Sequence, residues 1–197
     1  MNILRFPITV GLIALSVIAS IPSVGGNGIF APFLIATPGA PAFSEILGGE
    51  VWRVVTPIFL HFGPLHLLFN MMWLWDLGRA MELLRGRVFY LAFVVVTGAA
   101  ANLAQYAITG HSTFGGMSGV VYALLGYFWM QGRFNPRAGF ALHQSTVIMM
   151  IGWFVLCWVG VLGPIANWAH TAGLALGIAW GFLDRRPVAA VLSREAG

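Results

Sequence analysis

A serine stands between glycines in the segment 113–122, which reads Thr-Phe-Gly-Gly-Met-Ser-Gly-Val-Val-Tyr. Enzymes with a serine nucleophile hold it on a tight turn flanked by glycines, because only glycine tolerates the backbone angles and the close neighbouring chain there. The pattern makes Ser118 a candidate nucleophile. A serine hydroxyl is a weak nucleophile unless a base takes its proton, and the oxyanion that it forms needs hydrogen-bond donors.

His170 is the candidate base. It lies in the sequence Ala-His-Thr-Ala-Gly at residues 169–173, where an apolar segment begins, and Gly177 follows four residues after Gly173. Small residues at this spacing let two helices approach closely inside a membrane. The segment that begins at Ser118 has a matching set of small residues at Gly119, Ala123 and Gly126. Close packing of the two segments would bring His170 within hydrogen-bond distance of Ser118.

No carboxylate is well placed to orient the imidazole of His170. The acidic residues of the chain are Glu45, Glu50, Asp76, Glu82, Asp184 and Glu195. They fall in the loop before the second apolar segment, well below the level of Ser118, or on the cytoplasmic side. We therefore expect a Ser–His dyad and not a triad. Tyr122 follows Ser118 by one helical turn on the same face, so its ring is expected to pack on His170 and steady it.

Oxyanion donors are expected on the second apolar segment. His66 and Asn70 are four residues apart, so on a helix their side chains point the same way. The backbone N–H of Ser118 is a third candidate, because the first N–H groups of a helix have no partner within that helix.

The composition indicates an all-α membrane protein. Of the 197 residues, 59% are apolar and only 8% are charged, whereas about 25% are charged in soluble domains. Six apolar segments approach the length of about 20 residues that crosses a hydrocarbon core. They cover residues 7–24, 62–82, 87–107, 115–132, 144–162 and 168–183. We expect one six-helix membrane domain over residues 1–197, with a long loop 1 at about 25–60.

The first segment has an alternative interpretation. Residues 7–24 could be a signal peptide, because Ala19-Ser20-Ile21 is a tolerable cleavage context. A first transmembrane helix is preferred, because the rest of the chain needs it for a consistent topology.

The positive charges of the chain are ten arginines, and they predict its orientation. With the N-terminus in the cytoplasm, nine of the ten are cytoplasmic and only Arg53 is outside, as the positive-inside rule requires. Both termini, including the short polar tail at 185–197, are then cytoplasmic. The arginines form no dense run with aromatics, so no nucleic-acid partner is expected. The single cysteine, Cys157, excludes an intramolecular disulfide.

Residue counting places the candidate site residues at one depth. Ser118, His170 and His66 lie fifteen, fourteen and thirteen residues before Arg133, Asp184 and Arg79, charged residues that mark the cytoplasmic edge. Each therefore sits about 20 Å above that edge, or about 10 Å below the outer surface of the hydrocarbon core. Polar groups at this depth should face the bundle interior or a water-filled cavity.

Each feature alone also has a plainer interpretation. Serine, histidine and asparagine in membrane helices usually serve packing or interhelical hydrogen bonds, and His61, His111 and His143 are expected to be of that kind or to lie in loops. The coincidence of several polar groups at one depth, beside a helix broken by glycines, favours a reactive site.

Over about residues 50–184, the chain contains a set of motifs that resembles, in type and in order along the sequence, the motifs of bacterial rhomboid intramembrane serine proteases. The motifs are Trp52-Arg53, His66-x-x-x-Asn70, Gly78-x-x-x-Glu82-x-x-x-Gly86, Gly116-Met117-Ser118-Gly119-Val120-Val121-Tyr122-Ala123 and Ala169-His170-x-x-Gly173-x-x-x-Gly177.

The resemblance implies a six-helix fold, here without an N-terminal cytoplasmic domain, and a role for each matching residue. Ser118 would be the nucleophile and His170 the base, with oxyanion contacts from His66, Asn70 and the Ser118 amide. Supporting roles would fall to Tyr122, Gly116, Gly119 and Met117, and structural roles to Trp52, Arg53, His61 and Glu82. Phe69, Trp153 and Phe154 would line a substrate gate, and Gln105 would lie near the site. Asp76 departs from the family pattern.

The expected function is cleavage of transmembrane segments of other membrane proteins, in the bacterial inner membrane. No metal or cofactor is implied, and the oligomeric state is left open. Two other functions are weighed: an inactive rhomboid-like protein that escorts membrane proteins, and a small transporter with broken helices. The intact serine and histidine count against the first, and the lack of charged coupling residues near the midplane counts against the second.

Overall fold

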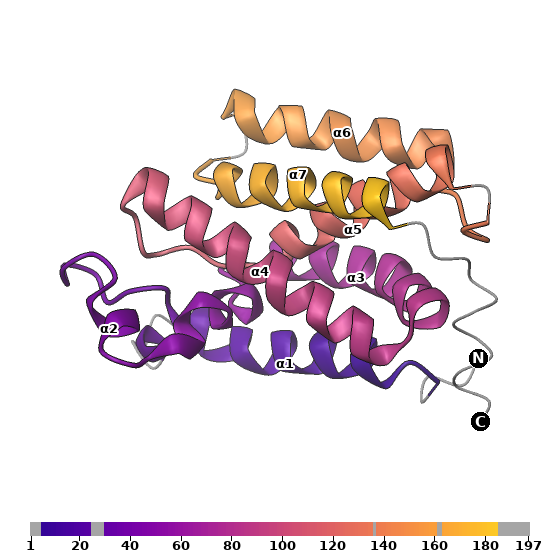
Figure 1. The fold of residues 1–197 in the computed structure, drawn as a ribbon. Coiled ribbons are helices and arrows are strands. Elements are labelled where there is room, and N and C mark those ends of the chain that lie inside the picture. The colour runs from indigo at the N-terminus through magenta and orange to yellow at the C-terminus, as the bar shows by residue number, and fades with distance from the viewer. Residues whose placement is uncertain (1–4, 25–29, 136, 161–162, 185–197) are drawn as a thin grey trace.

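The computed structural model describes residues 5–24, 30–135, 137–160 and 163–184. The described chain is helical, and each of the six predicted apolar segments forms one long helix (Figure 1). The long helices are α1 (Pro7–Val24), α3 (Pro64–Arg85), α4 (Arg87–Thr109), α5 (Ser118–Phe134), α6 (Gln144–Val159) and α7 (Asn167–Leu183). The predicted tail at 185–197 lies outside the described residues.

Proline and glycine set several of the helix ends. α1 and α3 begin at Pro7 and Pro64, where the missing N–H of proline costs nothing because a first-turn N–H has no helical partner. α4 and α6 are followed by Gly110 and Gly160, which have φ of 69° and 82°. Glycine reaches this left-handed conformation without strain and so terminates a helix.

Loop 1 contains four short helical turns, η2 (Ala31–Phe33), α2 (Ser44–Leu47), η3 (Val51–Val54) and η4 (Thr56–Phe59). The buried Arg53 organises it. Its Nη1 donates to the carbonyls of Ala31 (2.8 Å) and Leu34 (3.0 Å), and its Nε pairs with Glu50 (2.6 Å).

A second anchor within loop 1 is the Glu45 carboxylate, which accepts from the Thr37 N–H (2.8 Å). Hydrogen bonds from Thr37 lower the pKa of Glu45 to about 2. The carboxylate therefore stays ionised, and holds Thr37, at any physiological pH.

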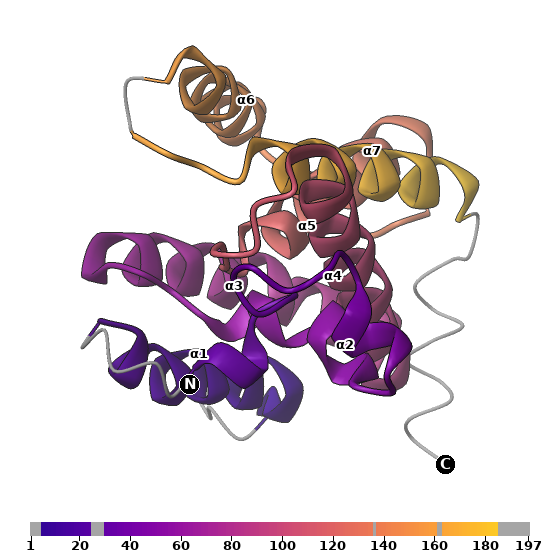
Figure 2. The same ribbon diagram turned by 90° about the vertical axis from the view of Figure 1, so that its left-hand side faces the viewer.

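The helices form one bundle with α5 at its centre and α6 at its edge (Figures 1 and 2). Most of α5 is buried, whereas Met150 and Cys157 are the buried residues of α6. α3 and α5 end, and α1 and α4 begin, at the same end of the bundle, which we call the arginine end because Arg85, Arg87 and Arg133 mark it. α7 also ends there (Figure 1).

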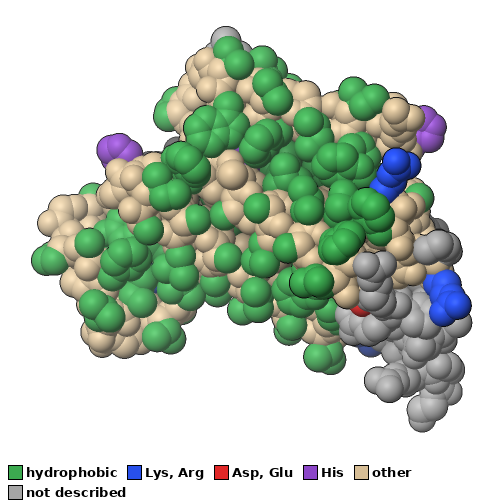
Figure 3. Space-filling model, turned by 45° about the horizontal axis from the view of Figure 1, so that its top comes forward, with side chains coloured by type: hydrophobic (Ala, Val, Ile, Leu, Met, Phe, Trp, Pro, Cys, Tyr) green, Lys and Arg blue, Asp and Glu red, His purple; other side chains and the backbone are tan. Residues whose placement is uncertain are grey.

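The surface combines a broad apolar area with charge at one end. In Figure 3 hydrophobic side chains are spread across the visible face, and the arginines in that view gather at its right-hand side. By length and composition, α4 is the one helix of the described part that could cross a membrane by itself. The other apolar helices that this criterion finds, Pro7–Ile21 and Gln144–Val159, are shorter.

The closest helix packing joins α5 and α7 through glycine. A Cβ on Gly173 would collide with the backbone of Gly119, and a Cβ on Gly177 with the backbone of Ala123. This close approach was predicted from the spacing of these small residues, and it is confirmed. Gly181 continues the contact one turn further, against the backbone of Tyr127.

Polar side chains fasten the arginine end. Arg85 Nε donates to the Tyr127 hydroxyl, which donates to Asp184 Oδ2 (2.6 Å). Gln131 Nε2 donates to the carbonyls of Gly181 and Asp184. This buried cluster ties the ends of α3, α5 and α7 together.

The start of α1 is held by a side chain of α3. The buried Glu82 carboxylate accepts from the N–H groups of Ile8 (3.0 Å) and Thr9 (2.9 Å), and from the Thr9 hydroxyl (2.8 Å). An anionic acceptor is favourable at a helix N-terminus. Glu82, for which the family resemblance implies a structural role, thus caps a different helix from its own.

The packing of α5 on α7 predicts that the same Gly→Ala substitution has different effects on stability at two helical glycines. Gly177→Ala should destabilise the protein by roughly 1–3 kcal/mol, because the added Cβ overlaps the Ala123 backbone. Gly152→Ala on α6 is the matched control, since a Cβ there has no atom within 4 Å. Thermal unfolding in detergent micelles compares the two variants, and equal melting temperatures would contradict the packing argument.

Candidate active site

The turn before α5 can be built only from glycine. Gly116 has φ of 122°, and its N–H donates to the Pro57 carbonyl (3.0 Å). A Cβ on Gly116 would lie 2.7 Å from the His66 ring, and one on Gly115 would lie 2.6 Å from the Leu60 carbonyl oxygen. Glycine at these two positions therefore allows the turn to pack closely against loop 1 and α3. α5 begins directly after it, at Ser118.

His61 holds the same turn through a hydrogen bond to its backbone. Its Nε2 accepts from the Met117 N–H (3.2 Å), so the ring proton of the neutral imidazole must be on Nδ1. Nδ1 lies 3.2 Å from both the Phe59 carbonyl and the Ser20 hydroxyl on α1. His61, expected to make an ordinary packing hydrogen bond, thus connects α1 and loop 1 to the residue before Ser118. Its only sequence signal was the resemblance.

The structure brings Ser118 and His170 together. Ser118 Oγ lies 2.8 Å from His170 Nε2, at the starts of α5 and α7. The imidazole is buried, and its Nδ1 has no hydrogen-bond partner among the described residues. An acceptor–donor pair at this distance can pass the serine proton to the imidazole. The geometry is that of a dyad, since no carboxylate of the described part of the chain bonds to His170 Nδ1.

An aromatic ring packs against the imidazole of His170. The Tyr122 ring lies 4.9 Å from the His170 ring, centre to centre, at an angle of 43°. Phe154 of α6 packs edge-on against the other side of Tyr122, with ring centres 5.5 Å apart. The Tyr122 hydroxyl is 3.4 Å from the Met150 carbonyl.

The candidate oxyanion donors on α3 make no hydrogen bond to the serine among the described residues. His66 is exposed, and its ring borders the Gly116 turn. Asn70 is buried, and its Nδ2 donates to the His66 carbonyl (2.9 Å). Among the hydrogen bonds of the described residues, none joins His66 or Asn70 to Ser118 or His170. The Ser118 N–H, as the first of α5, lacks a partner within its helix.

The candidate gate residues lie on facing helices. The rings of Phe69 on α3 and Trp153 on α6 are 6.1 Å apart, and both are about half exposed. Phe154 points inward to Tyr122, as described above. An aromatic contact therefore joins α3 to α6, and the next residue of α6 packs on Tyr122.

Asp76 forms a surface ion pair. Its Oδ1 accepts from Arg79 Nη2 (3.0 Å), and the Arg79 guanidinium lies 4.6 Å from the Trp75 ring centre. This contact gives Asp76 a partner on its own helix.

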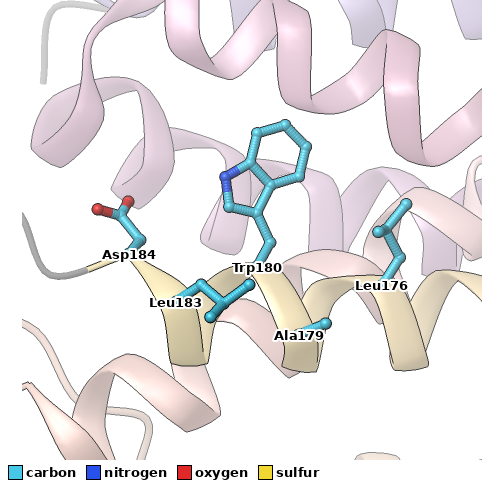
Figure 4. Close-up of a pocket in the computed structure, with 5 residues that line it drawn as sticks. All are labelled: Leu176, Ala179, Trp180, Leu183 and Asp184. Atoms are coloured by element: carbon cyan, nitrogen blue, oxygen red, sulfur yellow. The ribbon is translucent and has the colours of Figure 1, made fainter.

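One pocket lies along α7, between Leu176 and the arginine end. It is lined by Leu176, Ala179, Trp180, Leu183 and Asp184, at the arginine end of α7 (Figure 4). Asp184 is fourteen residues after His170, or about 21 Å along the helix. Within the described ranges, no three His, Cys, Asp or Glu side chains converge as a metal site requires.

Comparisons with known proteins agree with the motif resemblance. The model of the rhomboid domain matches residues 48–187. Proteins named "Rhomboid protease GlpG" from Salmonella paratyphi A, Salmonella choleraesuis and Salmonella newport are each 41% identical over 143 residues. The matched region is 72% of this chain and 51% of each relative, so the chain spans about half the length of these curated relatives. A domain model that covers most of the chain shows that it belongs to the rhomboid family.

Proposed function

We propose that this protein is an intramembrane serine endopeptidase that cleaves transmembrane segments of other membrane proteins. The observation that carries the proposal is the 2.8 Å separation of Ser118 Oγ and His170 Nε2. The names of the curated relatives support it. An inactive escort protein would have no use for this pair.

The proposed reaction has two steps that share one base. Ser118 Oγ attacks the scissile carbonyl while His170 Nε2 takes its proton, and the imidazolium then gives that proton to the leaving amine. The product is an acyl-enzyme on Ser118. Water attacks the ester with His170 again as base, and the serine hydroxyl is restored. Water would enter on the exposed side of His66, next to the turn.

Three donors would stabilise the tetrahedral oxyanion. The Ser118 N–H is fixed by the start of α5, and the exposed His66 ring lies beside the turn. Asn70 would have to exchange its bond to the His66 carbonyl for one to the oxyanion. A donor that changes partner in the transition state contributes to the rate and not to substrate binding.

The proposed membrane arrangement has six spans, with both termini in the cytoplasm of a bacterial cell and loop 1 outside. The arginine end would face the cytoplasm, which agrees with the positive-inside rule. The dyad would then lie at the outer half of the bilayer. A substrate helix would enter between α3 and α6 past Phe69 and Trp153. Residues 1–197 would form one membrane domain.

Removal of the nucleophile should abolish activity. A fluorophosphonate probe should label the purified wild-type protein, and Ser118→Ala should lose both the labelling and the cleavage of a model transmembrane substrate in proteoliposomes. His170→Ala should lose both as well, because within the described ranges His170 is the base that hydrogen-bonds to Ser118 Oγ. A wild-type protein that the probe does not label would contradict the proposal. Ser16→Ala, on α1, is the control substitution.

The Tyr122 ring should matter more than its hydroxyl. Tyr122→Ala should lower kcat by about 100-fold, since a displacement of about 1 Å in a catalytic group has that effect. Tyr122→Phe should lose far less, because its hydroxyl makes only a 3.4 Å contact with the Met150 carbonyl. Steady-state cleavage of the model substrate measures both. Equal losses in the two variants would show that ring packing on His170 is not the cause.

Substrates with weak helices near the cleavage site should be preferred. A helical peptide hides its carbonyl in an intrahelical hydrogen bond, so the segment must unwind before Ser118 can attack. Glycine or proline at the site should therefore raise kcat/KM relative to a leucine-rich segment of the same length. Competition between paired substrates tests this, and insensitivity to helix-breaking residues would count against the proposed route.

A further inference from the structure

The first turn of α7 has no cap of its own. The first N–H groups of a helix need acceptors, which the N-cap side chain usually supplies. The N-cap residue here is Ala166, which has no acceptor in its side chain. Its φ of −76° and ψ of 64° form an inverse γ-turn, with the Asn167 N–H donating to the Ile165 carbonyl (2.9 Å).

Gln105 of α4 supplies the missing cap. Its Oε1 accepts from the N–H groups of Trp168 (3.0 Å) and Ala169 (3.3 Å). Both partners are donors, so only the oxygen of the amide can face them. These are the second and third residues of α7, whose N–H groups an ordinary N-cap side chain would take. Gln105 is buried, so water does not compete easily for these bonds.

The capped turn carries the base. His170 directly follows Ala169, and its Nδ1 has no hydrogen-bond partner among the described residues. No polar group therefore holds the imidazole from behind, and its direction depends on the backbone of the first turn and on the Tyr122 ring. If that turn frayed, Nε2 would not stay 2.8 Å from Ser118 Oγ.

We propose that Gln105 is a positioning residue for His170. Gln105 caps α7 from α4 and so orients the base by holding its backbone. In a catalytic triad, the carboxylate orients the base by a hydrogen bond to the imidazole itself. The inference rests on the proposed protease function, and it adds a residue whose side-chain hydrogen bonds go to backbone N–H groups of α7.

Four substitutions test the cap. Gln105→Met keeps the length and removes the acceptor, and Gln105→Asn leaves the acceptor about 1.5 Å short. Both should lower kcat roughly tenfold, as expected for the loss of a helix cap, with KM little changed. Gln105→Glu keeps an acceptor of the same reach and should retain most of the wild-type kcat. Gln144→Met makes the same chemical change at the exposed first residue of α6 and should have no effect.

Rates are expressed per active site, counted by fluorophosphonate labelling, so that a loss of folded protein does not pass for slow chemistry. A structural role alone would lower the number of active sites and leave kcat unchanged. Wild-type kcat in Gln105→Met or Gln105→Asn, or a Gln105→Glu variant as slow as they are, would overturn the proposal.

Amide hydrogen exchange provides a readout that needs no activity. The Trp168 and Ala169 amides should exchange roughly tenfold faster in Gln105→Met than in wild type, while the amides of α5 stay protected. Unchanged exchange at these two amides would overturn the cap directly. If wild type neither binds the probe nor cleaves, the protease proposal fails separately, and the exchange result still decides whether Gln105 caps α7.

Discussion

The contact between the α5 and α7 backbones is the constraint on which the site depends. Gly173 and Gly177 have no side chain to separate the helices, so the two chains meet at Gly119 and Ala123. Inside lipid there is no hydrophobic drive for helices to associate, and close packing of small residues is a main source of their affinity. The same contact brings the base near the nucleophile, because Ser118 and His170 lie in the first turns of the two helices that touch.

Backbone groups at helix ends that are buried in a membrane bundle must find polar partners. Here several of those groups come from other helices. Glu82 of α3 caps α1, Gln105 of α4 caps α7, and Gln131 of α5 closes the last carbonyls of α7. Each such bond removes an unsatisfied backbone group and ties two elements at the same time. Glu82, Gln105 and Gln131 are polar residues in an apolar sequence, and their hydrogen bonds hold neighbouring helices together.

The sequence predicts some of this site well and some of it poorly. The level of Ser118 and His170, and their approach through small residues, followed from charge positions and spacing, since helix rise is constant and glycine spacing reports one face. The caps by Gln105 and the bridge by His61 depend on which side chain of a distant segment meets a backbone amide. Residue counting carries no such information. The Asn70 amide bonds to its own helix, a local competition between acceptors that spacing also cannot resolve.

A contact that repeats every four residues does not fix its own alignment. If α7 slid by one turn, glycines would again meet the α5 backbone, but the imidazole would move about 6 Å along the axis and lose the serine. The information that selects one alignment lies in the features that do not repeat. These are Gln105 on the amides of Trp168 and Ala169 at one end, and the Tyr127–Asp184 hydrogen bond at the other. Hydrogen bonds at its two ends fix the position of α7 along α5, whereas the glycine contacts between them hold the two helices together in more than one alignment.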